Sequence, residues 1–219
     1  MKALVALVAI CGRLAIAQPM PANITLKAIF TDEKERDQRE KILELVLAMG
    51  LKPGSTVGDL GTGYGYYAAR FAKVVGPNGR IYAEEIDKPL LNKVRQRMAS
   101  QNITNITLVL GAPDDPKFPT GTLDAVIIAD VYHELDHPDA ILNHVKKALK
   151  PGGKVLIIDY LKPALLERSR AEQAREHNIA PRLIESDLVT SGFTIGSVID
   201  SYATGYDGIP MFYILATAK

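Results

Sequence analysis

Cysteine is almost absent from this chain. Its 219 residues include a single cysteine, Cys11, which lies in the apolar N-terminal segment. If that segment is removed on export, the mature chain contains no cysteine. Disulfides, thiolate metal sites and thiol nucleophiles are then excluded.

Long apolar runs and an excess of one charge are also lacking. No apolar run reaches the roughly 18 residues that a membrane-spanning helix needs, so we expect no stable membrane span. The 26 basic and 25 acidic residues leave a formal net charge of +1. This balance argues against a partner held by its phosphates, so we expect no nucleic-acid partner. It leaves the oligomeric state open.

The first 17 residues have the layout of a secretory signal. Lys2 supplies a positive start, Ala3–Cys11 is apolar, and Ala15-Ile16-Ala17 has the small-residue spacing of a cleavage site. We therefore expect export to the periplasm or the medium. The alternative is a cytoplasmic protein whose N-terminal helix packs on the domain. The predicted division is a possible signal peptide over 1–17, an extension with a helix over 18–50, and one main domain over 51–219.

Short apolar runs alternate with amphipathic stretches along the main domain. This alternation predicts an α/β fold in which helices cover both faces of a parallel sheet. A capping-box-like start near Thr31 and apolar residues up to Met49 predict a helix before the sheet. Expected strands are 56–60, 80–84, 107–110, 125–129, 154–159, 194–202 and 211–218, and expected helices are 66–75, 89–100, 138–149, 165–177 and 181–191. The last strand follows a short loop, so it should run antiparallel.

A glycine-rich bend follows the first expected strand. Asp59 ends the strand, and Gly61, Thr62, Gly63 and Gly65 lead into a helix at position 66. Glycines permit positive φ and let a ligand approach the backbone, and the helix start offers free N–H groups. Two ligand classes fit such a bend, dinucleotides and S-adenosylmethionine. The carboxylate would repel a diphosphate and attract an ammonium or sulfonium group, which favours the second.

An acid about 20 residues beyond such a bend is placed to accept hydrogen bonds from ribose hydroxyls. Glu85 has that position, with Glu84 or Asp87 as solvated neighbours. The simpler interpretation is that these acids only end a strand.

Taken together, these motifs resemble the class I S-adenosylmethionine-dependent methyltransferases of the small-molecule type, from about Thr31 to Lys219. The matching segments are the glycine bend after Asp59, the acid Glu85, Gly111–Asp115 near the adenine position, Gly121–Val126 before a fourth strand and the Leu-Lys-Pro-Gly-Gly turn within Leu149–Asp159. The family's usual Gly-Asp-Ala order is absent from the third of these, so both Asp114 and Asp115 are candidates for the adenine contact.

The resemblance implies a Rossmann-like three-layer sandwich with a mostly parallel seven-stranded sheet whose last strand is antiparallel. It also implies S-adenosylmethionine as cofactor and methyl transfer to a small-molecule acceptor. The implied cofactor-binding residues are Asp59, Gly61, Thr62, Gly63, Gly65, Glu85, Asp114, Asp115 and Asp130.

Candidate catalytic residues follow the fourth expected strand, since ligands bind beyond the carboxyl ends of strands in such sheets. His133 is the natural proton acceptor, and Tyr132 would orient the acceptor or border the methyl group. His177, in the insertion after the fifth strand, would meet them across the pocket. The alternatives are that His133 caps a helix or faces solvent and that His177 is a surface residue.

Three further hypotheses compete with this one. Asp130 and Asp159 end neighbouring strands and would hold Mg²⁺ as in catechol-type O-methyltransferases, although Tyr160 replaces the expected asparagine, so no metal is assigned. The glycine bend is also similar to that of isoaspartyl-type protein-carboxyl methyltransferases. Finally, the chain could be a non-catalytic protein that keeps only a nucleoside pocket.

Overall fold

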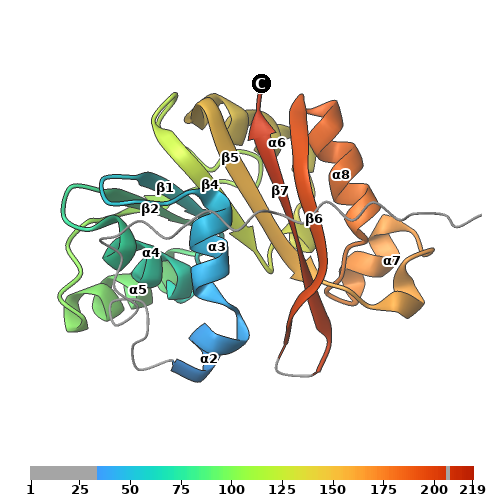
Figure 1. Cartoon of the computed structure of the whole chain (residues 1–219), viewed down its shortest axis with the longest axis horizontal. Helices are drawn as coiled ribbons and strands as arrows, with labels where there is room; N and C mark the ends of the chain where they lie inside the picture. The colour runs from blue at the N-terminus through green and yellow to red at the C-terminus, as the bar shows by residue number, and fades with distance from the viewer. Residues whose placement is uncertain (1–33, 206–207) are drawn as a thin grey trace, which may run out of the picture.

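The computed structural model describes residues 34–205 and 208–219. The predicted signal peptide and the segment up to residue 33 lie outside the described residues, so export stays a prediction. Within the described ranges, no helix is both long and apolar enough to cross a membrane. The described part forms one twisted sheet with helices on both faces (Figure 1).

The elements alternate as expected along the chain. In order they are α2 (Lys34–Arg39), α3 (Ile42–Met49), β1 (Thr56–Leu60), α4 (Tyr66–Val75), β2 (Arg80–Glu85), α5 (Lys88–Ser100), β3 (Ile106–Leu110), β4 (Leu123–Ala129), the 3₁₀ turn η1 (Tyr132–Glu134), α6 (Pro138–Ala148), β5 (Leu149–Tyr160), the 3₁₀ turn η2 (Pro163–Leu165), α7 (Arg170–Arg175), α8 (Pro181–Thr190), β6 (Phe193–Thr204) and β7 (Pro210–Ala218).

The seven strands lie in the order β3-β2-β1-β4-β5-β7-β6. The first five strands in this order run parallel to one another, and β7 runs antiparallel to both β5 and β6. This confirms the predicted fold class and the antiparallel last strand. The carboxyl ends of β1, β2, β4 and β5 therefore meet at one edge of the sheet, where ligands bind in open α/β sheets.

The core has two halves because successive strand residues point to opposite faces. In β4, Ala125 and Ile127 join the apolar cluster under α3 and α4, whereas Val126 and Ile128 join the cluster under α6 and α8. The same alternation continues in β5. Both faces of the central strands are thus buried, which explains their nearly continuous apolar sequence.

Three expected boundaries are wrong. The single N-terminal helix is broken at Lys41, which has a left-handed φ of 44°, so that α2 and α3 are separate. Leu149 begins β5 instead of ending the preceding helix, because it pairs with Leu123. The helix expected over 165–177 is only α7, since the Ser169 and Glu172 side chains form a capping box that sets its start.

A buried ionic network attaches α2 to the start of α4. Arg70 donates from Nε to Asp37 Oδ1 at 2.7 Å, and Tyr66 donates its hydroxyl to the same oxygen at 2.7 Å. Tyr67 donates to Glu40 Oε2 at 2.6 Å. Because Tyr66 and Tyr67 directly follow the glycine bend, this network fixes the helix on which the bend rests.

Candidate active site

The glycine bend joins β1 to α4 through three residues with left-handed φ. Gly61, Gly63 and Gly65 have φ values of 66°, 54° and 75°. A Cβ added at Gly61 would lie 2.6 Å from Cγ2 of Val131, a residue that follows β4. The bend therefore needs glycine at position 61 for two reasons, its φ and its contact with the chain leaving β4.

Asp59 holds the bend against the helix. Its Oδ2 accepts hydrogen bonds from the Thr62 hydroxyl at 2.6 Å and from the Ala68 N–H at 3.0 Å. The side chain is buried, and burial raises its pKa to about 7 even though these two hydrogen bonds act in the opposite direction. Asp59 thus organises the loop from within.

The two glutamates at the end of β2 contact the same bend. Glu84 Oε2 accepts from the Gly61 N–H at 3.0 Å, and Glu85 Oε2 accepts from the Gly63 N–H at 3.1 Å. The expectation that Glu84 is solvated is wrong, because only 3% of it is exposed and burial raises its pKa to about 7. Its carboxylate fills the space where a side chain at Gly111 would lie.

The two aspartates predicted near adenine differ in position. Asp114 is exposed, whereas Asp115 is half-buried and its charge contributes to the raised pKa of Glu84. Asp115 also accepts from the Lys117 N–H at 2.8 Å. Asp115 therefore lies nearer to the buried acids than Asp114 does, and the adenine contact itself stays a prediction.

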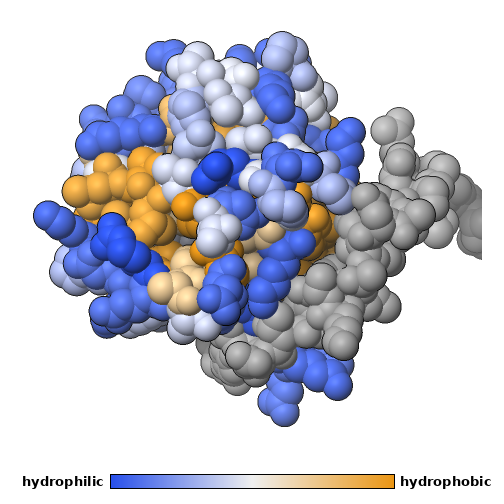
Figure 2. Space-filling model, turned by 90° about the vertical axis from the view of Figure 1, so that its left-hand side faces the viewer, coloured by the Kyte–Doolittle hydropathy of each residue, from blue (hydrophilic) through white to orange (hydrophobic). Residues whose placement is uncertain are grey.

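Large apolar side chains are exposed beside these acids. Tyr64 in the bend, Ile86 after β2 and Leu110 at the end of β3 are 61%, 57% and 45% exposed. Figure 2 views the molecule from the side of β1, β2 and α5 and shows an apolar area bordered by hydrophilic residues. Acidic groups with apolar neighbours suit a ligand that has both polar and flat apolar parts.

The raised pKa values of Asp59 and Glu84 predict how stability depends on pH. Both groups hold protons up to about pH 7 when folded but titrate near their ordinary 3.8 and 4.5 when unfolded. Between about pH 4 and 7 the folded state therefore binds more protons, so the free energy of unfolding falls as pH rises. We expect a lower Tm at pH 8 than at pH 5, and a shallower decline in Asp59→Asn, measured by thermal denaturation. A Tm that rises over this range in the unsubstituted chain would contradict the assignment.

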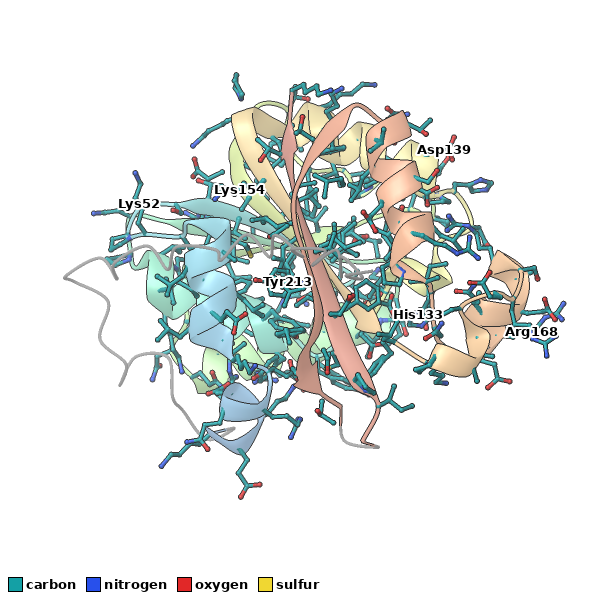
Figure 3. All side chains as sticks on the ribbon, turned by 45° about the vertical axis from the view of Figure 1, so that its right-hand side comes forward. Lys52, His133, Asp139, Lys154, Arg168 and Tyr213 are labelled. Carbon is teal, nitrogen blue, oxygen red and sulfur yellow. The ribbon has the colours of Figure 1, made fainter. Side chains whose placement is uncertain are left out.

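A histidine and a buried aspartate meet at the ends of β4 and β5. His133 lies in η1, between the sheet and the helices α7 and α8 (Figure 3). Its Nδ1 lies 3.0 Å and 3.1 Å from the two oxygens of Asp159, which also accepts from the His133 N–H at 3.2 Å. Burial alone would lower the pKa of His133, but the hydrogen bond and charge of Asp159 raise it.

His133 also lines a cavity of about 280 Å³, here called the β4–β5 pocket, and its Nε2 lies 3.7 Å from Oε1 of Glu134 in the same lining. The pocket is lined by Asp130, His133, Glu134, Tyr160, Lys162, His177 and Ile209. Most of these side chains are polar or charged, so the pocket suits a polar ligand.

Two pocket residues have unusual backbone conformations. Asp130 and His177 are non-glycine residues with left-handed φ values of 59° and 48°. Burial, and then the nearby Asp159 carboxylate, raise the pKa of Asp130 to about 6. The His177 ring packs edge-on against that of His133, with ring centres 5.4 Å apart. The structure thus brings His133 and His177 together as expected.

Tyr132 lies elsewhere. It is fully buried, and its hydroxyl donates to Asp187 Oδ2 at 2.9 Å, which also pairs with Arg170 at 2.6 Å. Adjacent residues of a 3₁₀ turn point about 120° apart, so Tyr132 faces α8 while His133 faces the pocket. The structure does not bring Tyr132 into the β4–β5 pocket.

Comparison with known proteins agrees with this geometry. Residues 57–153 match the family model described as a methyltransferase domain. The ubiquinone/menaquinone biosynthesis C-methyltransferase UbiE of Pseudomonas putida is 32% identical over 153 residues, which cover 68% of this chain and 60% of that protein. The chain belongs to the class I S-adenosylmethionine-dependent methyltransferases.

Solved structures share the fold. A SAM-dependent methyltransferase from Aquifex aeolicus superposes with a TM-score of 0.72 at 23% identity, covering 88% of this chain and 97% of that one. A geranyl diphosphate methyltransferase in complex with SAM has a TM-score of 0.69 at 17% identity, covering 85% of this chain and 88% of that one. These superpositions show that the overall fold is shared.

Two positions of the candidate site were not predicted from the sequence. Asp159 was considered only as a metal ligand, but it pairs with His133. The parallel register of β4 and β5, in which Ala129 lies beside Ile158, places the two strand ends together and provides the signal for this contact. Glu84 was taken for a solvated neighbour of Glu85, and only its direct approach to Gly111 in three dimensions shows otherwise.

Proposed function

We propose that this chain transfers a methyl group from S-adenosylmethionine to a small polar molecule. The cofactor would lie over the glycine bend and the acceptor in the β4–β5 pocket. One observation carries the proposal: the N–H groups of Gly61 and Gly63 are each bound by a glutamate from the end of β2. The glycine bend and the carboxylates therefore form one continuous surface at the carboxyl ends of the parallel strands.

The charge of this surface favours S-adenosylmethionine over a dinucleotide. The charge of Glu85 raises the pKa of both Asp59 and Glu84, and the charge of Asp59 adds to the raised pKa of Glu84. A diphosphate would add negative charge beside them, whereas a sulfonium and an ammonium group would be attracted. Glu85, at 8% exposed, is the member most accessible to ribose hydroxyls.

The two halves of the site are adjacent in the sheet. β1 and β4 are neighbouring strands, and Val131 contacts the position of Gly61. Bound S-adenosylmethionine supplies a methyl carbon already activated by its sulfonium, so the protein's main task is alignment. The bend would hold the donor, and the residues after β4 would hold the acceptor in line with it.

The acceptor is proposed from the pocket itself. The chain spans 60% of the length of the P. putida relative, so the substrate in that protein's name is no more than a guide to a small-molecule acceptor. The pocket volume of about 280 Å³ and its polar lining support a compact polar acceptor. They do not favour a protein chain, the substrate of the isoaspartyl-type alternative.

Calorimetry with two cofactors tests the donor half. We expect S-adenosylmethionine to bind and NAD not to bind. The Glu85→Ala substitution should weaken S-adenosylmethionine binding by about 10–100-fold, because charge-assisted hydrogen bonds to the ribose are lost. Glu167→Ala, an exposed position outside the site, should bind like the unsubstituted chain. Binding of NAD alone would overturn the proposal.

Transfer itself is tested with labelled cofactor and a metabolite extract. We expect a labelled small molecule that is identifiable by mass spectrometry. Cofactor binding without any labelled product would favour the non-catalytic alternative.

A further inference from the structure

We propose that the β4–β5 pocket binds one divalent transition-metal ion through His133 Nε2, the Glu134 carboxylate and His177 Nδ1. The first observation is an unsatisfied atom. Among the described residues, His133 Nε2 has no hydrogen-bond partner, although the side chain is 1% exposed. Buried polar atoms in folded proteins have a partner, so this atom points to a ligand.

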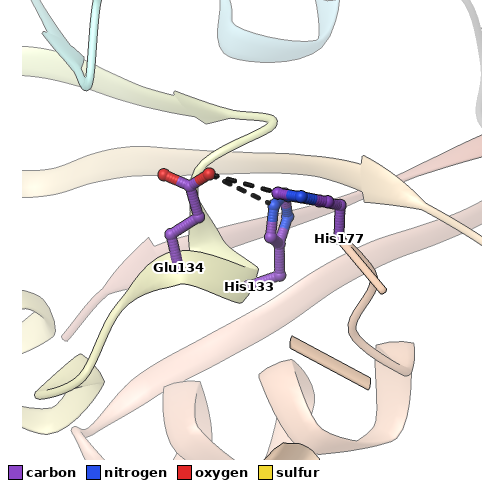
Figure 4. A group of neighbouring side chains, drawn as sticks. All are labelled: His133, Glu134 and His177. Carbon is purple, nitrogen blue, oxygen red and sulfur yellow. Dashed lines mark ion pairs between the residues drawn. The ribbon is translucent and has the colours of Figure 1, made fainter. Parts of the chain in front are cut away.

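The three side chains surround one position (Figure 4). Glu134 Oε1 lies 3.7 Å from His133 Nε2 and 3.8 Å from His177 Nδ1, and all three ligand atoms lie within 4.8 Å of one another. A tetrahedral Zn²⁺ with bonds of about 2.0–2.1 Å separates its ligands by about 3.3 Å. The two distances to Glu134 exceed this by about half an ångström, and the two histidine nitrogens lie within 4.8 Å of each other. Glu134 and His177 are 59% and 74% exposed, so both can move inward.

Asp159 orients the buried ligand. A metal-binding histidine commonly donates its other ring N–H to a carboxylate, which fixes the tautomer and ring direction. Here the fully buried Asp159 carboxylate lies within hydrogen-bond distance of His133 Nδ1. A proton on Nδ1 leaves the lone pair of Nε2 directed at Glu134 and His177.

Charge and donor type indicate the class of ion. Asp130, Glu134 and Asp159 bring three carboxylates to the two imidazoles, and Lys162, which also lines the pocket, donates to the Glu176 carbonyl. Two imidazoles and one carboxylate suit Zn²⁺ and similar ions better than Mg²⁺, which prefers oxygen ligands. From the sequence, Mg²⁺ on Asp130 and Asp159 was considered and no metal was assigned. In the structure Asp159 contacts His133, so the candidate ligands are two imidazoles and the Glu134 carboxylate.

The metal site stands on this geometry alone, whereas its use rests on the proposed methyl transfer. Three protein ligands leave a fourth position open. An acceptor hydroxyl bound there would lose its proton to water more readily; its oxygen would then bond to the methyl carbon while the sulfur keeps the electron pair of the broken bond. In this arrangement the metal, and not His133, would activate the acceptor.

Metal titration of the untagged full chain tests the site. After dialysis against EDTA, we expect one Zn²⁺ per chain in a competition titration, and intense visible absorption of a four-coordinate ion with Co²⁺. Glu134→Gln and His177→Gln, both at exposed positions, should weaken Zn²⁺ binding by about 100-fold or more while the fold is kept. His137→Gln, another exposed histidine, should bind Zn²⁺ like the unsubstituted chain.

Three outcomes would overturn the site: no stoichiometric Zn²⁺, equal affinity in His177→Gln and the unsubstituted chain, or a loss in His137→Gln as large as in His177→Gln. S-adenosylmethionine binding, measured separately by calorimetry on the same samples, keeps the two proposals distinct. A chain that binds the cofactor but no metal would leave the proposed function intact and remove the metal.

Discussion

Replacing Asp37 with alanine should lower the free energy of unfolding by about 3–5 kcal/mol. The Asp37 carboxylate faces the guanidinium of Arg70 at 2.7 Å, and the two side chains are 0% and 1% exposed. Removing one partner of a buried ion pair leaves the other charge without its main compensation, and the Tyr66 hydroxyl loses the same acceptor. For a chain of this size the loss corresponds to a fall in Tm of roughly 6–20 °C.

Thermal denaturation of three variants would check the cause. Asp139→Ala, at an exposed position of α6, should leave Tm nearly unchanged. The double variant Asp37→Leu/Arg70→Met should recover much of the loss, because an apolar pair of similar volume needs no compensating charge. If Asp37→Ala melts within 2 °C of the unsubstituted chain, on the order of 1 kcal/mol, the network is not the attachment described here.

Replacing Gly61 with alanine should remove most cofactor binding and destabilise the fold by about 2–5 kcal/mol. The left-handed φ of 66° costs a non-glycine residue about 1–2 kcal/mol. The new Cβ would also lie 2.6 Å from Val131 Cγ2, and overpacking of this kind costs about 1–3 kcal/mol. Either the Val131 side chain or the bend must shift to relieve the contact, and a shift of the bend away from β4 would separate the proposed donor and acceptor sites.

Gly63 offers a matched control for this substitution. It shares the left-handed φ, at 54°, but a Cβ there would meet no atom within 4 Å. Gly63→Ala should therefore show only the backbone cost. Adding Val131→Ala to Gly61→Ala should restore stability toward that of Gly63→Ala, and calorimetry with S-adenosylmethionine should follow the same order. Equal effects of Gly61→Ala and Gly63→Ala would rule out the contact with Val131.

The sequence predicted the framework well because the relevant signals are local. The β1 strand, the glycine bend and α4 follow from apolar runs and glycine spacing, and their bounds agree with the structure. The order of motifs then identified the family, which the comparisons confirm. Break points such as Lys41 were not predictable, because tertiary contacts of Glu40 with α4 override the local helical pattern.

The site was predictable only in part. His133 and His177 lie 44 positions apart in sequence, yet the prediction that they meet is confirmed by their packed rings. Tyr132 was assigned by its neighbourhood in sequence, and the direction of its side chain depends on the η1 turn, which no sequence signal specifies. The burial of Glu84 was not predicted for a similar reason, since it depends on how β2 lies against β3 and the chain at Gly111.

The direction of β7 has a practical consequence. Met211, at its start, pairs with Tyr160 beside the pocket, and Thr217, near its end, pairs with Lys154 at the opposite edge of the sheet. Lys219 therefore emerges far from the bend and the pocket, where the end of the chain is marked in Figure 1. A fusion partner or surface tether attached at Lys219 would leave the glycine bend and the β4–β5 pocket uncovered. This position is therefore preferred for immobilising the protein in binding assays.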